Sequence, residues 1–338
     1  MKVLVTGAGA VLGQGIIKSL RMANTSYYII AVDPDPRAVG LYWADRAYLV
    51  PLVTDPSYLD VVCHILQCQR PDVLLIGTDV ELPIYAQHKS ELESRYKTRI
   101  IVSPLEVIEI ANDKWLTYEF LSMNGFPCPK SALPADISQI LWEWNFPLIV
   151  KPRIGARSVG VHLVKNEQQL YQALTRVENP IIQECVANAS QEYTSGVVVN
   201  MEGIATAVVT MRRELRDGNT YRAYVEPDAP FNFLLAKIAE NLGGIGPLNF
   251  QFRVEQGIPK IFEINARFSG TTPVRAYAGF NEVDYLIQHC VLGTSIPAPQ
   301  VRAIAVFRYW HEIIVEPEQL KQFTNNFKHA TTTINKHS

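Results

Sequence analysis

Four polar residues lie on two neighbouring strands predicted in the last third of the sequence. In the stretch KIFEINAR, Glu263 and Asn265 are two residues apart and so face one side of a strand, which Arg267 continues. Gln251 lies in the preceding strand, LNFQFRVEQ, and a turn at 257–259 brings it opposite Glu263. A strand whose polar face meets solvent is the plain alternative, but oxygen ligands of this kind suit Mg²⁺ bridged to phosphates.

Two lysines and a glycine-containing loop supply groups that bind phosphates. Lys114 lies in the predicted helix NDKWLTYEFL, and Lys151 ends the strand FPLIVKP just before the loop RIGARSVG. Lysines on separate elements can hold a triphosphate from two sides, while the loop places backbone N–H groups and the Ser158 hydroxyl over it. A single lysine is usually a solvated surface charge. The combination favours a phosphate site.

The strand PIIQECV offers a complementary site for a base. It ends at Gln183 and Glu184, where a chain leaving the strand has free backbone donors and acceptors for an adenine edge. Glu192, eight residues further on, is placed to hold ribose hydroxyls. A surface carboxylate at a strand end is an equally good explanation of Glu184 taken alone.

The elements that position these residues follow from the apolar pattern. Short apolar runs alternate with helical stretches over the first 110 residues (KVLVTG, YYIIAVD, DVLLIGTD, RIIVSP), which predicts an α/β unit with a parallel sheet. The helical pattern EVIEIANDKWLTYEFLSMNGF follows and ends at Gly125, and a domain boundary is expected near its start. Further on, the sequence predicts a hairpin at 193–211, a polar loop that holds four arginines at 212–222, and a helix at 231–242.

A glycine motif opens the first predicted helix. Gly7, Gly9 and Gly13 follow a strand, and Asp33 ends the next one, as in a dinucleotide-binding turn. The spacing, GxGxxxG, also suits any helix that packs closely on a parallel sheet. A Rossmann-like sheet without a bound dinucleotide is therefore the favoured interpretation, and a nicotinamide-dependent oxidoreductase or epimerase is the alternative.

That alternative needs a Tyr-x-x-x-Lys pair for its acid/base step. The only match is Tyr85 and Lys89, which comes before the fourth predicted strand and among fifteen tyrosines. One such match is expected by chance, so the alternative is weakened.

Composition limits the class of protein. The 338 residues carry a formal charge of −2 and no basic cluster large enough to indicate nucleic-acid binding. Five cysteines without a CxxC pair favour a reducing, cytoplasmic setting and argue against structural zinc. No apolar stretch approaches the roughly 20 residues of a membrane-spanning helix, so no membrane partner is expected.

With these features in place, the sequence resembles the ATP-grasp superfamily, and most closely its carbamoyl-phosphate-synthetase-like ligases. The motifs NDK, KPRIGARSVGV, IIQE, EYT and FEINARFSGTTP occur in the family's order and approximate spacing. The resemblance covers nearly the whole chain, since a Rossmann-like domain usually precedes the grasp. It implies an α/β N-terminal domain at 1–110, a small lobe at 111–186 with a mobile loop at 153–160, a large lobe at 187–315 and a polar tail at 316–338.

The resemblance also implies roles for individual residues. Arg267 and Lys151 match the catalytic positions, and Gln251, Glu263 and Asn265 match the metal ligands. Arg213, Ser269 and Gly270 fall where relatives approach substrate. The positions that match ATP-binding residues are Lys114, Lys151, Gly155, Ser158, Gly160, Glu184, Cys185, Val186 and Glu192.

The implied activity is that of an ADP-forming ligase. ATP and Mg²⁺ are the implied cofactors, with one or two metal ions and Mn²⁺ as a substitute; Gln251 stands where many relatives carry a second acidic ligand. The substrate carboxylate becomes an acyl phosphate, which an amine or similar nucleophile then attacks. Small-molecule substrates and a homodimer are expected, and glutamine-derived ammonia would require a separate partner. A nucleotide sensor without turnover is the remaining alternative.

Overall fold

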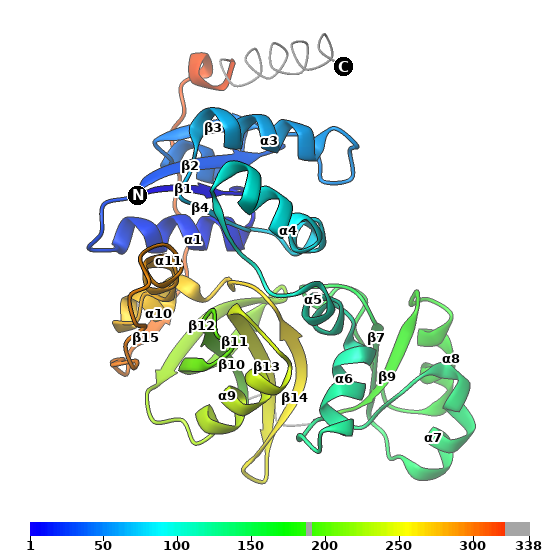
Figure 1. Ribbon diagram of the computed structural model, residues 1–338. Coiled ribbons are helices and arrows are strands. Elements are labelled where there is room, and N and C mark those ends of the chain that lie inside the picture. The colour runs from blue at the N-terminus through cyan, green and yellow to red at the C-terminus, as the bar shows by residue number, and fades with distance from the viewer. Residues whose placement is uncertain (187–190, 322–338) are drawn as a thin grey trace.

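The first hundred residues form a five-stranded parallel sheet with helices on its faces. The computed structural model describes residues 1–186 and 191–321. The strands lie in the order β3-β2-β1-β4-β5, so the direction of winding reverses between β1 and β4 (Figure 1). The strands are β1 (Lys2–Val5), β2 (Tyr28–Asp33), β3 (Arg46–Leu49), β4 (Val73–Leu75) and β5 (Arg99–Ile101), and the helices are α1 (Val11–Met22), α2 (Val39–Trp43), α3 (Tyr58–Gln69) and α4 (Leu82–Tyr96).

The predicted α/β class is confirmed, but the apolar pattern revealed only four of the five strands. The missing strand is β3, which forms one edge of the sheet and pairs only with β2 within it. None of its four residues is fully buried. An edge strand that is half exposed does not require the continuous apolar run by which a buried parallel strand is recognised.

The glycine motif serves the packing of α1 against the sheet. Gly7 has φ of +54°, and a Cβ there would lie 2.3 Å from the side chain of Thr78. A Cβ on Gly13 would lie 2.2 Å from the Gly7 carbonyl oxygen. The carboxylate of Asp33 accepts hydrogen bonds from the backbone N–H groups of Gly9 (2.7 Å) and Asp35 (2.9 Å), so it stabilises the turn itself.

Two helices and a small antiparallel sheet follow. The predicted continuous helix is broken at Asp113, whose side chain caps the second helix by accepting from the Trp115 N–H group. The sheet has the order β6-β9-β7-β8, with α7 and α8 packed against it. These elements are α5 (Leu105–Asn112), α6 (Lys114–Met123), β6 (Ser131–Ala132), α7 (Ile137–Glu143), β7 (Leu148–Pro152), β8 (His162–Val164), α8 (Glu167–Leu174) and β9 (Pro180–Glu184).

A six-stranded antiparallel sheet forms the rest of the molecule, in the order β14-β13-β10-β11-β12-β15. The predicted hairpin and the helix near 231–242 are confirmed. The arginine-rich stretch predicted as a polar loop is instead the hairpin of β11 and β12, in which Arg212 and Arg216 stack on tyrosine rings. The elements are β10 (Glu192–Val199), β11 (Ala205–Arg216), β12 (Asn219–Glu226), α9 (Asn232–Asn241), β13 (Gly246–Glu255), β14 (Ile258–Asn265), α10 (Thr272–Ala278), α11 (Glu282–Leu292) and β15 (Ala305–Phe307).

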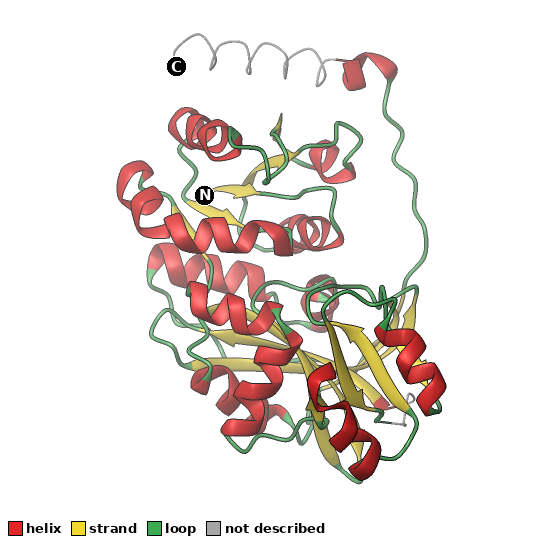
Figure 2. Cartoon of the chain, turned by 90° about the vertical axis from the view of Figure 1, so that its right-hand side faces the viewer, coloured by secondary structure: helices red, strands yellow, loops and turns green. Residues whose placement is uncertain are grey.

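Helices α10 and α11 join the large sheet to the N-terminal domain, since both pack against α1 (Figure 1). After β15 the chain runs in an extended conformation along the outside of the N-terminal domain toward the last described residues (Figure 2). Most of the tail predicted at 316–338 lies outside the described residues. No helix within the described ranges is long and apolar enough to cross a membrane.

Candidate functional site

Two connected cavities lie beside the large sheet. The first, of about 190 Å³, lies between the four-stranded and six-stranded sheets. The second, of about 740 Å³, lies between the N-terminal domain and the large sheet. Lys114, Arg213, Gln251 and Glu263 line both, so the two cavities are continuous at these side chains.

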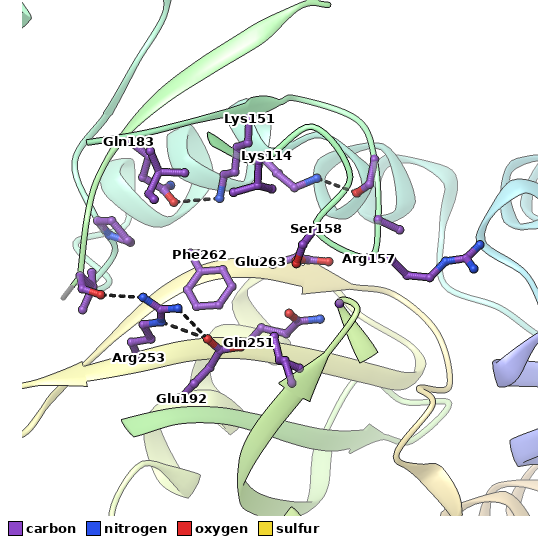
Figure 3. Close-up of a pocket in the computed structure, with 18 of the residues that line it drawn as sticks. Lys114, Lys151, Arg157, Ser158, Gln183, Glu192, Gln251, Arg253, Phe262 and Glu263 are labelled. Carbon is purple, nitrogen blue, oxygen red and sulfur yellow. Dashed lines mark hydrogen bonds and ion pairs between the residues drawn. The ribbon is translucent and has the colours of Figure 1, made fainter. Parts of the chain in front are cut away.

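Lys151 and Lys114 lie on the small-sheet side of the first cavity (Figure 3). Lys151 is 6% exposed, and its Nζ donates to Oε1 of Gln183 at 2.8 Å. Burial, together with the nearby positive charge of Lys114, lowers the pKa of Lys151 to about 7. The Nζ of Lys114 donates to the backbone oxygens of Arg153 (3.3 Å) and Gly155 (2.8 Å). Lys151 therefore borders the cavity as a poorly solvated amine, and Lys114 anchors the start of the loop at 153–160.

The loop at 153–160 is folded over the first cavity. The loop begins at Arg153, whose guanidinium forms an ion pair with the Asp113 carboxylate at 2.6 Å. At its centre, Arg157 and Ser158 have φ values of +55° and +57°, a left-handed conformation that non-glycine residues adopt rarely. The loop also rests on the β11–β12 turn, where a Cβ on Gly218 would lie 2.2 Å from the Arg157 carbonyl oxygen. Ser158 lines the cavity, as predicted for a residue that covers phosphates.

Gln251 and Glu263 of the large sheet line the first cavity opposite these lysines, whereas Asn265 and Arg267 continue the polar row into the second cavity. The predicted pairing is confirmed, because Gln251 lies opposite Glu263 in the register of β13 and β14. Asn265 donates to Oε1 of Glu263 at 3.2 Å and accepts from Nη2 of Arg267 at 2.9 Å. The Nε of Arg267 donates to the Asp79 carboxylate at 2.7 Å. Asp79 belongs to the N-terminal domain and was not identified from the sequence, since 188 residues separate it from Arg267.

Phe262 also lines the first cavity, although strand alternation predicts that it faces away from Glu263. The register of β13 and β14 shifts at this point: Gln251 pairs with Glu263 and Phe252 with Ile261, so Phe262 has no partner in the ladder. A bulge of this kind redirects a side chain. Together with Ile149 and Val186, Phe262 gives the cavity an apolar wall suited to a flat ring.

A buried network of charges lies beneath Gln251. Glu192 accepts from Nη2 of Arg213 at 2.9 Å and from Nε of Arg253 at 3.0 Å. The same Nη2 of Arg213 donates to Oε1 of Gln251 at 2.7 Å. The Nε of Arg213 is buried and has no hydrogen-bond partner among the described residues. A buried donor without an acceptor is costly. Other atoms of the Arg213 side chain line both cavities.

The remaining predicted residues are divided among the two cavities and the surrounding structure. Glu184 and Val186 line the first cavity; Cys185, between them, does not, and burial raises the pKa of its thiol. Gly160 lies behind the loop, where a Cβ would lie 3.0 Å from Pro152. The first cavity is lined by Ser158 and Glu192, and the second alone by Asn265, Arg267, Ser269 and Gly270. Gly155 lines both cavities.

The hydroxyl of Ser269 is already engaged by its own structural neighbours. Arg275, which is 1% exposed, donates to it from Nη2 at 3.0 Å, and the hydroxyl of Thr271 lies 2.8 Å away. Arg275 is in turn held by the buried carboxylate of Glu282. Ser269 thus forms part of a rigid support below the second cavity.

A parallel-sheet domain, followed by two antiparallel sheets that enclose two lysines and a facing carboxylate, defines the ATP-grasp class. Comparison with known families agrees. Residues 111–271 match the model of the ATP-grasp domain, and residues 3–100 match the PylC-like, N-terminal domain. An ATP-grasp domain at 111–271 thus follows a PylC-like N-terminal domain at 3–100.

Relatives known by sequence are distant and longer. The carbamoyl phosphate synthase large chain of Methanocorpusculum labreanum is 24% identical over 303 residues, which cover 80% of this chain and 28% of that protein. The large chain of Helicobacter pylori is 23% identical over 302 residues, 80% of this chain and 27% of its own length. This chain spans less than a third of these relatives.

Solved structures share the fold over most of the chain. The N5-carboxyaminoimidazole synthetase of Staphylococcus aureus, in complex with ADP, has a TM-score of 0.73 at 18% identity and covers 97% of this chain and 86% of its own. The biotin carboxylase of Campylobacter jejuni has a TM-score of 0.70 at 16% identity and covers 89% of this chain and 73% of its own. An L-amino acid ligase of Bacillus licheniformis has a TM-score of 0.65 at 16% identity, covering 86% and 74%. At these identities the likeness establishes the fold.

Proposed function

We propose that this protein is an ATP- and Mg²⁺-dependent ligase that activates a carboxylate as an acyl phosphate and joins it to an amine, with release of ADP and phosphate. The proposal rests chiefly on one arrangement: Lys114 and Lys151 on one side of the first cavity and Glu263 on the other. The nicotinamide-dependent alternative has no support from the comparisons. Its candidate tyrosine, Tyr85, is buried in the core against Tyr58, and Asp33 is engaged by its own turn.

The donor set suits an anionic nucleotide. Lys114, Lys151 and Arg213 line the first cavity, and the Arg213 guanidinium, held by Glu192, adds a permanent positive charge at its wall. The apolar wall at Phe262 and Val186 suits an adenine ring, and the end of β9 at Glu184 supplies backbone groups for its edge. Glu192, held by two arginines, remains the proposed ribose contact, because each carboxylate oxygen can accept more than one hydrogen bond.

The oxygen atoms of Gln251, Glu263 and Asn265 fit a magnesium ion, which prefers oxygen ligands and keeps several waters. Only Glu263 among them is charged, and Gln251 already accepts from Arg213. A bound Mg²⁺ would neutralise phosphate charge and orient the oxygens of ATP. We propose at least one ion at Glu263, with Mn²⁺ as a substitute.

In the proposed reaction, a carboxylate oxygen of the substrate attacks the γ-phosphorus of ATP, and the bond to the β-phosphate oxygen breaks to release ADP. The amine then attacks the acyl carbon, and inorganic phosphate leaves. Lys151 and Arg267 hold the transferring phosphoryl group. Phosphoryl transfer requires mainly that the protein position the reactants and neutralise their charge. The loop at 153–160 shields the acyl phosphate from water.

The domain limits follow from the same proposal. We assign residues 1–110 to the N-terminal domain, 111–186 to the small lobe, 187–315 to the large lobe and 316–338 to a tail. A homodimer remains the proposed assembly. The five free cysteines fit a cytoplasmic location.

Substrate-dependent phosphate release tests this function. We expect purified protein to release ADP and phosphate with one member of a panel of amino acids and small carboxylates, and Glu263→Ala to abolish that release. Glu255→Ala, in the adjacent strand but outside both cavities, is the matched control and should keep full activity. Nucleotide binding without phosphate release on any member of the panel would favour a sensor. Unchanged ADP release in Glu263→Ala would contradict the assignment.

A further inference from the structure

The second cavity adjoins the proposed nucleotide site and is large enough for a small-molecule substrate. Its 740 Å³ falls in the range of small-molecule sites, roughly 300 to 1,000 Å³. It opens at the carboxyl ends of β1 and β4, where the winding of the parallel sheet reverses, and ligands of open α/β sheets bind at such a switch point. Residues of both domains line it, among them Leu12, Thr78 and Asn249.

Positive charge exceeds negative charge around this cavity. Five of its lining residues are basic and two are acidic; they are Lys114, Arg157, Arg213, Arg267 and Arg308, with Asp79 and Glu263. Arg267 is paired with Asp79 and Arg213 with Glu192. Lys114 and Arg157 belong to the part that borders the nucleotide cavity, and Arg157 points away from Lys151 (Figure 3). Arg308 remains as a charge that the nucleotide site does not use.

Arg308 has no carboxylate partner among the described residues. It follows β15, and its Nη2 donates to the backbone oxygen of Gly270, itself a lining residue, so the guanidinium lies at the cavity wall. It forms no ion pair within the described residues, and the stretches 187–190 and 322–338 contain no aspartate or glutamate. Burial lowers its pKa from the usual arginine value. Arg308 is half-buried, and a partly desolvated charge without a counterion is unfavourable, a cost that an anion beside it relieves.

The surroundings of Arg308 add positive charge and donors. Burial, and then the charge of Arg308, lower the pKa of Lys18 on α1, so a second cation lies nearby. Gly270 packs against Val11, in the first turn of α1, and a Cβ on Gly270 would lie 3.0 Å from that side chain. Ala10 precedes this turn without a side-chain cap, so the first N–H groups of α1 are not satisfied by a capping side chain. An anion held by Arg308 would therefore meet further donors.

We propose that the second cavity binds a small carboxylate that bears a second anionic group, either a carboxylate or a phosphate, and that Arg308 recognises this second group. The inference rests on the proposed ligase function. The reacting carboxylate then lies toward Arg267 and Glu263, and the second anion lies toward Gly270 and α1. Arg308 is a specificity residue that contacts substrate and takes no part in the transfer of the phosphoryl group.

Binding of three matched probes tests the proposal without requiring turnover. Butyrate, succinate and 3-phosphonopropionate share a short chain and differ in their second group: none, a carboxylate or a phosphonate. Their affinities are measured by calorimetry at constant ionic strength, with Mg²⁺ and a non-hydrolysable ATP analogue present. We expect one dianion to bind at least tenfold more tightly than butyrate, which corresponds to about 1.4 kcal/mol. Whichever dianion binds more tightly identifies the second group as carboxylate or phosphate.

Two variants assign the preference to Arg308. Arg308→Met should abolish the preference for the dianion while leaving the affinity for the ATP analogue unchanged, and Arg308→Lys should keep part of it. Arg302→Met is the matched control: Arg302 lies in the same segment and also donates to a backbone oxygen, that of Tyr277, but is exposed and outside the cavity. Equal binding of the three probes, no binding of either dianion, or a preference that survives in Arg308→Met would overturn the proposal. Loss of analogue binding in the wild-type protein would instead contradict the ligase assignment.

Discussion

The two cavities differ in how far their own residues satisfy one another. Around the first, Lys151 is bonded to Gln183, Glu192 to two arginines, and Lys114 to the loop it anchors. Around the second, Arg308 lacks a carboxylate partner within the described residues. The first cavity is therefore largely preorganised for one ligand, whereas the second requires its ligand to complete the charge balance. Substitutions should accordingly affect nucleotide use in the first cavity and substrate selection in the second.

After Glu263→Ala, the largest effect is expected from Lys151→Met. The change removes a buried amine that we propose contacts the transferring phosphates, so we expect kcat to fall by about 10²-fold or more. Folding should be retained, because the replacement also removes an amine whose charged form is poorly solvated. Steady-state kinetics and a thermal melt measure the two properties. A variant with normal kcat would show that Lys151 lies outside the reaction.

The number of protons taken up when ATP binds tests whether Lys151 is the group that becomes protonated. With a pKa of about 7, the amine is mostly neutral at pH 8 in the free protein. Phosphates favour the ammonium form and raise its pKa, so binding at pH 8 should take up nearly one proton, and affinity should fall as the pH rises above 7. Calorimetry in buffers of different ionisation enthalpy counts the protons. Uptake that persists in Lys151→Met would assign the proton to another group.

A smaller fall in kcat is expected from Asp79→Asn. This change tests whether a residue that lines only the second cavity can alter the reaction without altering nucleotide binding. Asp79 lies in the N-terminal domain and orients Arg267 through the 2.7 Å ion pair. We expect kcat to fall by about tenfold with the KM for ATP unchanged, because a positioning contact is lost while the nucleotide contacts remain. A higher KM for ATP with normal kcat would place Asp79 in nucleotide binding instead.

The smallest effect is expected from Gly218→Ala. The added methyl group would meet the Arg157 carbonyl oxygen, and φ of +71° at Gly218 is unfavourable for alanine. The loop should shift and the KM for ATP should rise several-fold without loss of the reaction. Gly203→Ala, in a turn of similar φ with open space around it, is the matched control. An identical KM in both variants would mean that the contact does not position the loop.

Much of the nucleotide cavity could be predicted from the sequence because its residues lie in short local patterns. Glu263 and Asn265 share one strand, β14, and the turn before it places Gln251 opposite Glu263. Arg267, predicted to continue that strand, lies just beyond its end at Asn265. Lys151 ends a recognisable strand, and the loop follows it directly. The α/β class followed from buried apolar runs, which are the strongest signal of a parallel sheet.

Only the part of the second cavity that follows β14 could be predicted in this way, because distant segments form the rest. Asp79 meets Arg267 across 188 residues, and Arg308 comes from a segment with little local pattern. Phe262 was missed for another reason, because the bulge in β14 overrides the alternation that predicts its direction. The edge strand β3 and the β11–β12 hairpin were missed because half-exposed strands need no continuous apolar run.

A crystal structure with Mg²⁺ and a non-hydrolysable ATP analogue tests the central claim most directly. The account predicts that the triphosphate lies between Lys114 and Lys151 on one side and a metal ion at Glu263 on the other, with the adenine beside Phe262. A nucleotide bound instead at the turn of Gly7, with the cavity between the two antiparallel sheets empty, would contradict it.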